Sequence, residues 1–212
     1  MRSLYLDCET FAQPHLVEMF RAHAVERGDD PVRFVATSTL LAQVVAIGVG
    51  NGGDAVTVYC GRNEADVLWS LAETMNCLRP QRIVTFAGRG FDLPLLINRM
   101  RVHGIQVPGL LMAAANEPRY RQTMNCDLQE QLILCGATFR KPSLREACIA
   151  FGIGDPKESC SGSDVQRLVE ANDWETVLEY CRSDVEHTIL LDHAVNPVRQ
   201  VVDDDCRETL PA

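Results

Sequence analysis

The sequence lacks three features that would place it among zinc-binding, secreted or membrane proteins. Its nine cysteines include no CxxC pair and are irregularly spaced, which disfavours a zinc site or a disulfide framework. The longest apolar stretch, "LLAQVVAIGV", is about ten residues and too short to cross a bilayer. The first residues, "MRSLYLDCET", contain no apolar segment typical of an export signal. We therefore expect a cytoplasmic protein with free thiols.

Positive charge is also scarce. The chain has 20 Lys and Arg against 29 Asp and Glu, and its formal net charge is −9. This balance alone argues against nucleic acid as a partner. The middle of the chain differs, because residues 79–145 hold ten Lys or Arg and four acids, a local charge of +6. A basic middle segment is compatible with phosphate binding at one face, and equally compatible with a solvated surface of mixed charge.

The chain has the length and composition of one ordinary folded domain, with 212 residues, 46% hydrophobic and 23% charged. Alternating apolar residues predict a strand over residues 2–10. The segments "QVVAIGVG" and "AVTVYC", separated by "NGGD", predict an antiparallel hairpin, and "RIVTFA" predicts a buried strand. Helices are predicted at 14–27, 63–78, 93–104, 126–134, 143–152, 163–170 and 173–192.

Local signals refine the ends of these helices. Asn63 is a candidate cap, and Ser143 with Glu146 predicts a capping box. Residues 108–123 show no clear periodicity and are expected to form a long loop. The polar residues 196–212 are expected to form a flexible tail. Because the hairpin is antiparallel, we predict a single α/β domain with a mixed β-sheet flanked by helices.

Three short patterns contain carboxylates that could form a site. Asp7 and Glu9 are two residues apart on the first strand, so their side chains leave the same face. Asp92 stands between a strand and a helix, where it can equally be a helix cap. Tyr180 and Asp184 are four residues apart on the last helix and share one face, where a local hydrogen bond is an alternative role. Each pattern alone also fits an ordinary structural position.

The order of the three patterns is more specific than any one of them. D-x-E on the first strand, F-D at a strand-to-helix turn and Y-x-x-x-D on a late helix resemble the tyrosine-bearing branch of the DEDD superfamily of 3′-5′ exonucleases. The segments "TFAGRGFDLPLL", "NCDLQEQL", "KPSLREACIAFGI" and "YCRSDVEHTILL" are similar to predicted exonucleases related to the proofreading domain of family B DNA polymerases. The resemblance covers residues 4–191. It implies a ribonuclease H-like fold over residues 1–195.

The resemblance also implies roles for individual residues. Asp7, Glu9, Asp92 and Asp184 become the ligands of two Mg²⁺ or Mn²⁺ ions, which such sites hold about 3.5–4 Å apart. Tyr180 becomes the residue that orients the attacking water. The implied substrate is the 3′ end of single-stranded DNA or RNA, with DNA favoured and nucleoside 5′-monophosphates as products. Candidate substrate contacts are Arg89, Phe91 and Lys157, although Phe91 can equally pack and Lys157 can be a solvated loop residue.

Other nearby residues have simpler interpretations. Asp127 is expected to cap a helix rather than act as a fifth ligand, and His187 is expected to be structural. Relatives usually have asparagine, a contact for the 3′-terminal nucleotide, where this chain has Ala87. This departure puts the grip on substrate in doubt more than the chemistry. Two other functions stay open: a nucleic-acid-binding module with weak catalysis, which only Ala87 supports, and a ribonuclease H-like nuclease that cuts internally.

Overall fold

The computed structural model describes residues 2–53, 55–156 and 161–197. Its five strands are β1 (Ser3–Phe11), β2 (Gln43–Gly50), β3 (Val56–Cys60), β4 (Arg82–Thr85) and β5 (Asn125–Asp127). They form one sheet in the order β3-β2-β1-β4-β5. β2 is antiparallel to both β1 and β3, whereas β4 is parallel to β1 and β5. The mixed sheet and the hairpin are confirmed.

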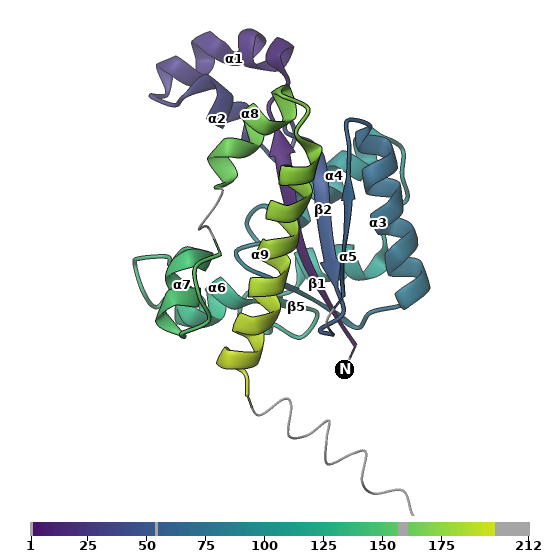
Figure 1. Cartoon of the computed structure of the whole chain (residues 1–212), viewed down its shortest axis with the longest axis vertical. Helices are drawn as coiled ribbons and strands as arrows, with labels where there is room; N and C mark the ends of the chain where they lie inside the picture. The colour runs from purple at the N-terminus through teal and green to yellow at the C-terminus, as the bar shows by residue number, and fades with distance from the viewer. Residues whose placement is uncertain (1, 54, 157–160, 198–212) are drawn as a thin grey trace, which may run out of the picture.

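Helices cover both faces of this sheet (Figure 1). One face packs against α3 (Glu64–Leu78), α4 (Asp92–Val102) and α5 (Gly109–Asn116), and their apolar residues form the largest core cluster. The other face is crossed by the long helix α9 (Trp174–Val195). The remaining helices are α1 (Pro14–Glu26), α2 (Pro31–Ala36), α6 (Leu128–Leu132), α7 (Leu144–Ala150) and α8 (Val165–Glu170), with short 3-10 turns at Leu134–Gly136 and Gly162–Asp164.

The alternation of side chains along β1 decides which residues face α9. Leu4, Leu6 and Cys8 belong to the core beneath α3 and α4, whereas Tyr5 packs in the cluster that includes α9. Because successive side chains point to opposite faces, Asp7 and Glu9 share the face of Tyr5. The first carboxylate pair is therefore presented toward the last helix.

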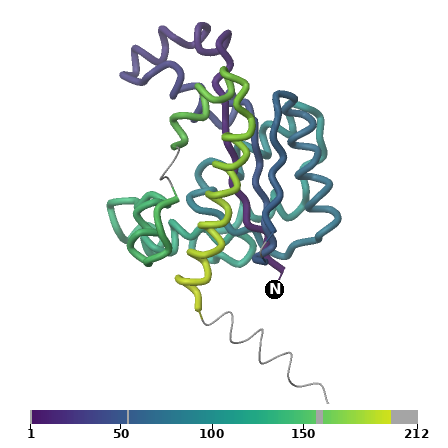
Figure 2. Tube along the Cα trace, in the orientation of Figure 1, coloured from purple at the N-terminus to yellow at the C-terminus, as the bar shows by residue number. Residues whose placement is uncertain are grey.

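A glycine allows α9 to lie close to the sheet. Gly48 of β2 is the register partner of Asp7. A Cβ at Gly48 would lie 2.6 Å from Val185 Cγ2 and 3.1 Å from Cys181 Sγ, so no side chain fits between strand and helix at this level. The tight contact fixes the height of α9 above Asp7. The trace in Figure 2 shows the first and last elements of the described chain side by side.

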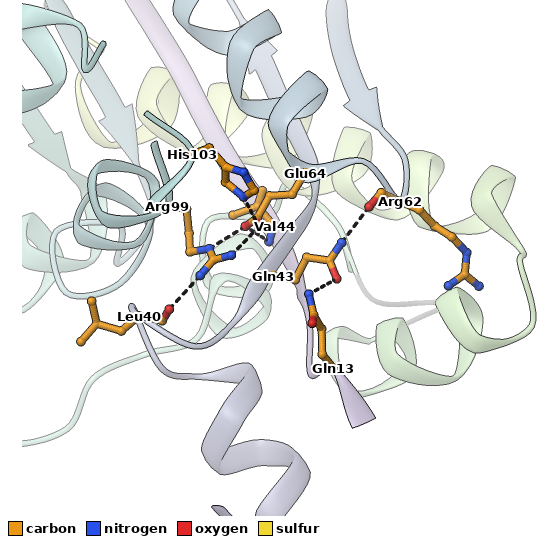
Figure 3. Close-up of polar contacts among 8 residues, drawn as sticks. All are labelled: Gln13, Leu40, Gln43, Val44, Arg62, Glu64, Arg99 and His103. Carbon is orange, nitrogen blue, oxygen red and sulfur yellow. Dashed lines mark hydrogen bonds and ion pairs between the residues drawn. The ribbon is translucent and has the colours of Figure 1, made fainter. Parts of the chain in front are cut away.

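A buried ion-pair network fastens α3 and α4 to the start of β2 (Figure 3). Glu64 is 4% exposed and accepts hydrogen bonds from Arg99 Nε at 2.8 Å and Arg99 Nη2 at 2.5 Å. The same carboxylate accepts from the Val44 N–H at 2.8 Å and lies 2.8 Å from His103 Nε2. Arg99 Nη1 also donates to the Leu40 carbonyl at 2.9 Å. The Glu64 network thus joins four segments through one carboxylate.

All three predicted helix caps lie at the expected positions, and two of them cap with their side chains. Ser143 and Glu146 form the expected capping box at α7. The Asp127 side chain accepts from the Glu130 N–H and caps α6, as predicted. Asn63 occupies the N-cap position of α3, but its side chain donates to Asp66 Oδ2 at 2.7 Å and does not accept from the helix backbone. The predicted position of the cap is therefore confirmed for Asn63, without a side-chain cap bond.

Two element predictions also need correction. The segment predicted as a long loop at 108–123 contains helix α5. The sequence "GLLMAAAN" lacks charged residues, so it has no polar face that would reveal helical periodicity. The segment predicted as a helix at 126–134 begins within strand β5, and α6 starts only at Leu128. Residues 198–212 of the expected tail lie outside the described part of the chain.

No helix among the described residues is long and apolar enough to cross a membrane.

Candidate carboxylate site

Three of the four predicted carboxylates come together between β1 and α9. One oxygen from each of Asp7, Glu9 and Asp184 can be chosen so that all three lie within 4.8 Å of one another. Glu9 and Asp184 are buried and Asp7 is partly exposed. The set thus joins residues from the two ends of the described chain. Carboxylate oxygens at this spacing suit hard divalent cations such as Mg²⁺ and Mn²⁺.

Local structure positions each side of this cluster. The pairing of β1 with β2 shifts register between Glu9 and Thr10, an irregularity typical of strands that re-aim a side chain beside a site. On α9 the helical period stacks Tyr180, Asp184 and Thr188, and all three are buried. The Thr188 hydroxyl donates to the Asp184 backbone carbonyl at 2.7 Å, one helical turn away on the same face of α9.

Tyr180 lies in the same site as a neutral phenol. Burial raises its pKa well above the ordinary value, and the charges of Glu9, Asp184 and Asp7 raise it further. A hydrogen bond with Asp184 acts in the same direction. The phenol therefore remains a hydrogen-bond donor throughout the physiological pH range.

Asp92, the fourth predicted carboxylate, is not one of the three members of this group. Phe91 occupies the N-cap position of α4, and Asp92 is the first residue of the helix. Asp92 Oδ1 accepts a hydrogen bond from Cys8 Sγ at 2.9 Å, and Cys8 stands between Asp7 and Glu9 on β1. Burial raises the pKa of Asp92 to about 6, against the lowering effect of the Cys8 hydrogen bond. The interpretation of Asp92 as a helix cap is therefore wrong.

Asp127 holds the turn that leads to Asp92. Its Oδ1 accepts from the Ala87 N–H and its Oδ2 accepts from the Arg89 N–H, both at 3.0 Å. Burial raises the pKa of Asp127, although these N–H donors lower it. The sequence predicted the helix cap made by Asp127 but not this second role, because the turn lies about 40 residues earlier.

Ala87 itself has an unusual backbone conformation. Its φ is +64°, in the left-handed region that glycine and asparagine occupy more readily than alanine. The asparagine that the resemblance implies for this position would suit this backbone better than alanine does. Alanine brings no polar side-chain group to this position and leaves local strain there.

The predicted substrate contacts are placed in different environments. Arg89 is half-buried and its Nη1 donates to the Glu117 carbonyl at 2.6 Å, while its Nε and Nη2 are enclosed. Its contact with substrate remains a prediction, and the geometry gives it a structural role in the turn. Phe91 packs against the main core cluster. Lys157 lies outside the described residues.

The buried thiols of Cys8 and Cys181 and the imidazole of His187 do not provide an alternative nucleophile or base. Burial raises the pKa of the Cys8 and Cys181 thiols well above their ordinary value, and neighbouring carboxylates raise it further. Neither thiol is therefore ionised near neutral pH. His187 Nδ1 lies 2.7 Å from the Ser183 carbonyl, so it is bound to its own helix. A structural role for His187 agrees with this contact.

Comparison with known proteins gives one matching family and a similar solved structure. A family described as predicted 3′-5′ exonucleases related to the exonuclease domain of PolB matches residues 34–207. The family B DNA polymerase of the hyperthermophilic archaeon Pyrobaculum calidifontis has a similar structure, with a TM-score of 0.66 and 17% sequence identity. The similarity covers 93% of this chain and 25% of the polymerase, so the chain spans a quarter of that protein's length. Among curated proteins, none matches.

Proposed function

The chain belongs to the family of predicted 3′-5′ exonucleases related to the exonuclease domain of PolB, and on this premise we propose that it degrades single-stranded nucleic acid from the 3′ end with the aid of divalent metal ions. The observation that supports this most is the meeting of Asp7, Glu9 and Asp184 within 4.8 Å, beside the protonated phenol of Tyr180. We favour DNA over RNA as the substrate. The products are nucleoside 5′-monophosphates and a strand shortened by one nucleotide.

Asp7, Glu9, Asp92 and Asp184 are the residues that would hold two Mg²⁺ or Mn²⁺ ions. When bound, divalent ions would make a water more acidic and would stabilise negative charge on the leaving oxygen. Such ions also offset the mutual repulsion of the clustered carboxylates.

Tyr180 orients the attacking water in the proposed reaction. Its phenol keeps its single proton and donates it to the Asp184 carboxylate, so a lone pair of the phenol oxygen accepts a hydrogen bond from the water and orients it toward phosphorus. The water oxygen forms a bond to phosphorus, the bond from phosphorus to the 3′ oxygen breaks, and that oxygen leaves as a 3′-hydroxyl. Asp127 acts indirectly, because its carboxylate holds the turn that leads to Asp92.

The direct test uses a single strand labelled at its 5′ end, incubated with Mg²⁺ or Mn²⁺. We expect a ladder of products shortened from the 3′ end, and no ladder after chelation. Asp7→Ala and Asp92→Ala should abolish the ladder, whereas Tyr180→Phe should weaken it less because every carboxylate remains. Absence of shortening with both metals and with both DNA and RNA would refute the proposal.

A circular single strand separates this activity from internal cutting. An exonuclease requires an end, so the circle should survive under conditions that degrade the linear strand. Linearisation of the circle would identify an endonuclease of the same fold. Metal-independent binding without any turnover would identify a binding module instead.

A further inference from the structure

A patch of exposed aromatic and basic side chains lies on the loops around α6. It consists of Tyr120, Arg121, Leu134, Phe139, Arg140 and Lys141, and we call it the aromatic–basic surface. Phe139 is fully exposed and Tyr120 is 80% exposed. Large aromatic side chains are costly to leave in water, so their clustering on a surface commonly marks a binding site.

The two loops that form this surface are fastened to each other. Arg119 Nε donates to Glu130 Oε2 at 2.5 Å. Cys135 Sγ donates to the Arg119 carbonyl at 3.6 Å, and Gln122 Nε2 donates to Cys135 Sγ at 3.4 Å. These contacts place residues 119–122 beside residues 134–136. The part of the surface formed by residues 119–122 and 134–136 is thus assembled before any ligand arrives, which lowers the entropy cost of binding.

The charge of this surface is positive although the whole chain is acidic. The acids Glu117, Asp127 and Glu130 are buried and accept hydrogen bonds inside the protein. The cations Arg121, Arg140 and Lys141 are exposed, and Arg140 pairs with the exposed Glu146. The charged side chains that residues 79–145 expose to solvent are therefore mainly cations. Such a face attracts a polyanion.

The same segment is physically connected to the carboxylate site. Asp127 begins α6 and its carboxylate holds the turn that leads to Asp92. Leu128 and Leu144 share a core cluster with Val185 of α9. Figure 1 shows α6 and α7 beside α9.

We propose that the aromatic–basic surface binds the single strand on the 5′ side of the nucleotide being removed. Tyr120 and Phe139 stack on bases, while the adjacent cations Arg121, Arg140 and Lys141 contact phosphates. This inference rests on the proposed exonuclease function and adds a substrate path to it. The occupant is single-stranded nucleic acid, because the exposed rings offer stacking surfaces for unpaired bases and the exposed cations offer contacts for phosphates.

Binding without cleavage tests the surface separately from the catalytic site. The probe is a fluorescein-labelled oligo(dT) of about 20 nucleotides, measured by anisotropy in the presence of EDTA. The variant is Tyr120→Ala combined with Phe139→Ala. The matched control is Trp69→Ala, since Trp69 is also an exposed aromatic residue but lies on α3. We expect the double variant to bind at least about fivefold more weakly, and the control to bind like the unaltered chain.

A second pair of variants tests how much positive charge contributes to binding of the single strand. Lys141→Gln and Arg79→Gln each remove one exposed positive charge, but Arg79 follows α3 and lies outside the aromatic–basic surface. Loss of one phosphate contact should reduce the slope of log affinity against log salt by about 0.7 for a single strand. We expect this change for Lys141→Gln only.

Two results distinguish this inference from the proposed function. Equal affinity of the double variant and the Trp69→Ala control would overturn the inference, whether or not the chain cleaves, and would point to a protein partner for the patch. If the double variant loses affinity but the unaltered chain never shortens a strand, the surface stands and the exonuclease proposal fails. Thermal unfolding of the double variant should match that of the control, because both side chains are exposed.

Discussion

Two acidic groups in this protein have opposite surroundings. Glu64 meets Arg99, His103 and a backbone N–H, whereas Asp7, Glu9 and Asp184 lie close to one another. Burial alone would raise the pKa of Glu64, but the hydrogen bonds from Arg99, Val44 and His103 lower it below its ordinary value. In the carboxylate site, burial and the nearby acids raise the pKa of Tyr180. The first group joins segments of the fold, and the second concentrates negative charge.

The strongest way to break this comparison is to remove one member of the site. Asp184→Asn should reduce cleavage by more than about a hundredfold, because a lost ligand disrupts metal binding. Stability without metal should stay the same or increase, since one repelling charge is removed. Cleavage assays and thermal unfolding in EDTA measure the two effects. A large loss of stability would show that Asp184 is structural like Glu64.

The matching change in the other group is Glu64→Gln. It should cost about 2–4 kcal/mol of unfolding free energy at neutral pH, because Arg99 loses its buried partner. The folded-state pKa of Glu64 lies below its ordinary value, so its contribution is present above that value. The contribution is lost as the pH falls through the folded-state pKa. Urea unfolding of both proteins across this acidic range should show the difference shrinking, and a constant difference would contradict the assignment.

The stabilisation caused by added metal also distinguishes the carboxylate site from Glu64. Mn²⁺ at about a hundred times its dissociation constant should add about 2.7 kcal/mol to the stability of the unaltered chain. Asp7→Asn should abolish this gain, whereas Glu64→Gln should retain it although it starts from a lower stability. Thermal scans with and without Mn²⁺ measure both. An equal gain in all three proteins would place the ion elsewhere.

The smallest expected effect concerns the turn before Asp92. Ala87→Gly should stabilise the fold by about 0.5–1 kcal/mol, because glycine relieves the positive φ of this residue. Ala113→Gly in helix α5 is the matched control and should destabilise by a similar amount. Urea unfolding distinguishes the signs. A loss of stability in both would show that the turn does not strain alanine.

The sequence predicted most of this architecture because long elements leave periodic patterns. The first strand, the hairpin, α4 and α9 were all expected within a few residues of their observed ends. β5 was missed because three residues are too few to show alternation, and α5 was missed because its apolar sequence has no polar face. The α/β class and mixed sheet were correct since they depend on the long elements.

The candidate site was predictable in its residues but not in its arrangement. The order of Asp7, Glu9, Asp92, Tyr180 and Asp184 indicated one centre, and the structure brings Asp7, Glu9 and Asp184 together beside Tyr180. The link from Asp92 to Cys8 and the grip of Asp127 on the turn were not predictable. Both depend on contacts across tens of residues, which no local pattern reports. The roles of all these residues as ligands remain a prediction.

The close contact of α9 with Gly48 has a consequence for how the protein is made. Asp7 and Glu9 leave the ribosome early, but Asp184 follows them by more than 170 residues along the chain. The site cannot exist until α9 has emerged and docked against β2. A nascent chain, or a fragment that ends before α9, therefore lacks Tyr180 and Asp184. Synthesis from the N-terminus thus delays any nuclease activity until the fold is nearly complete.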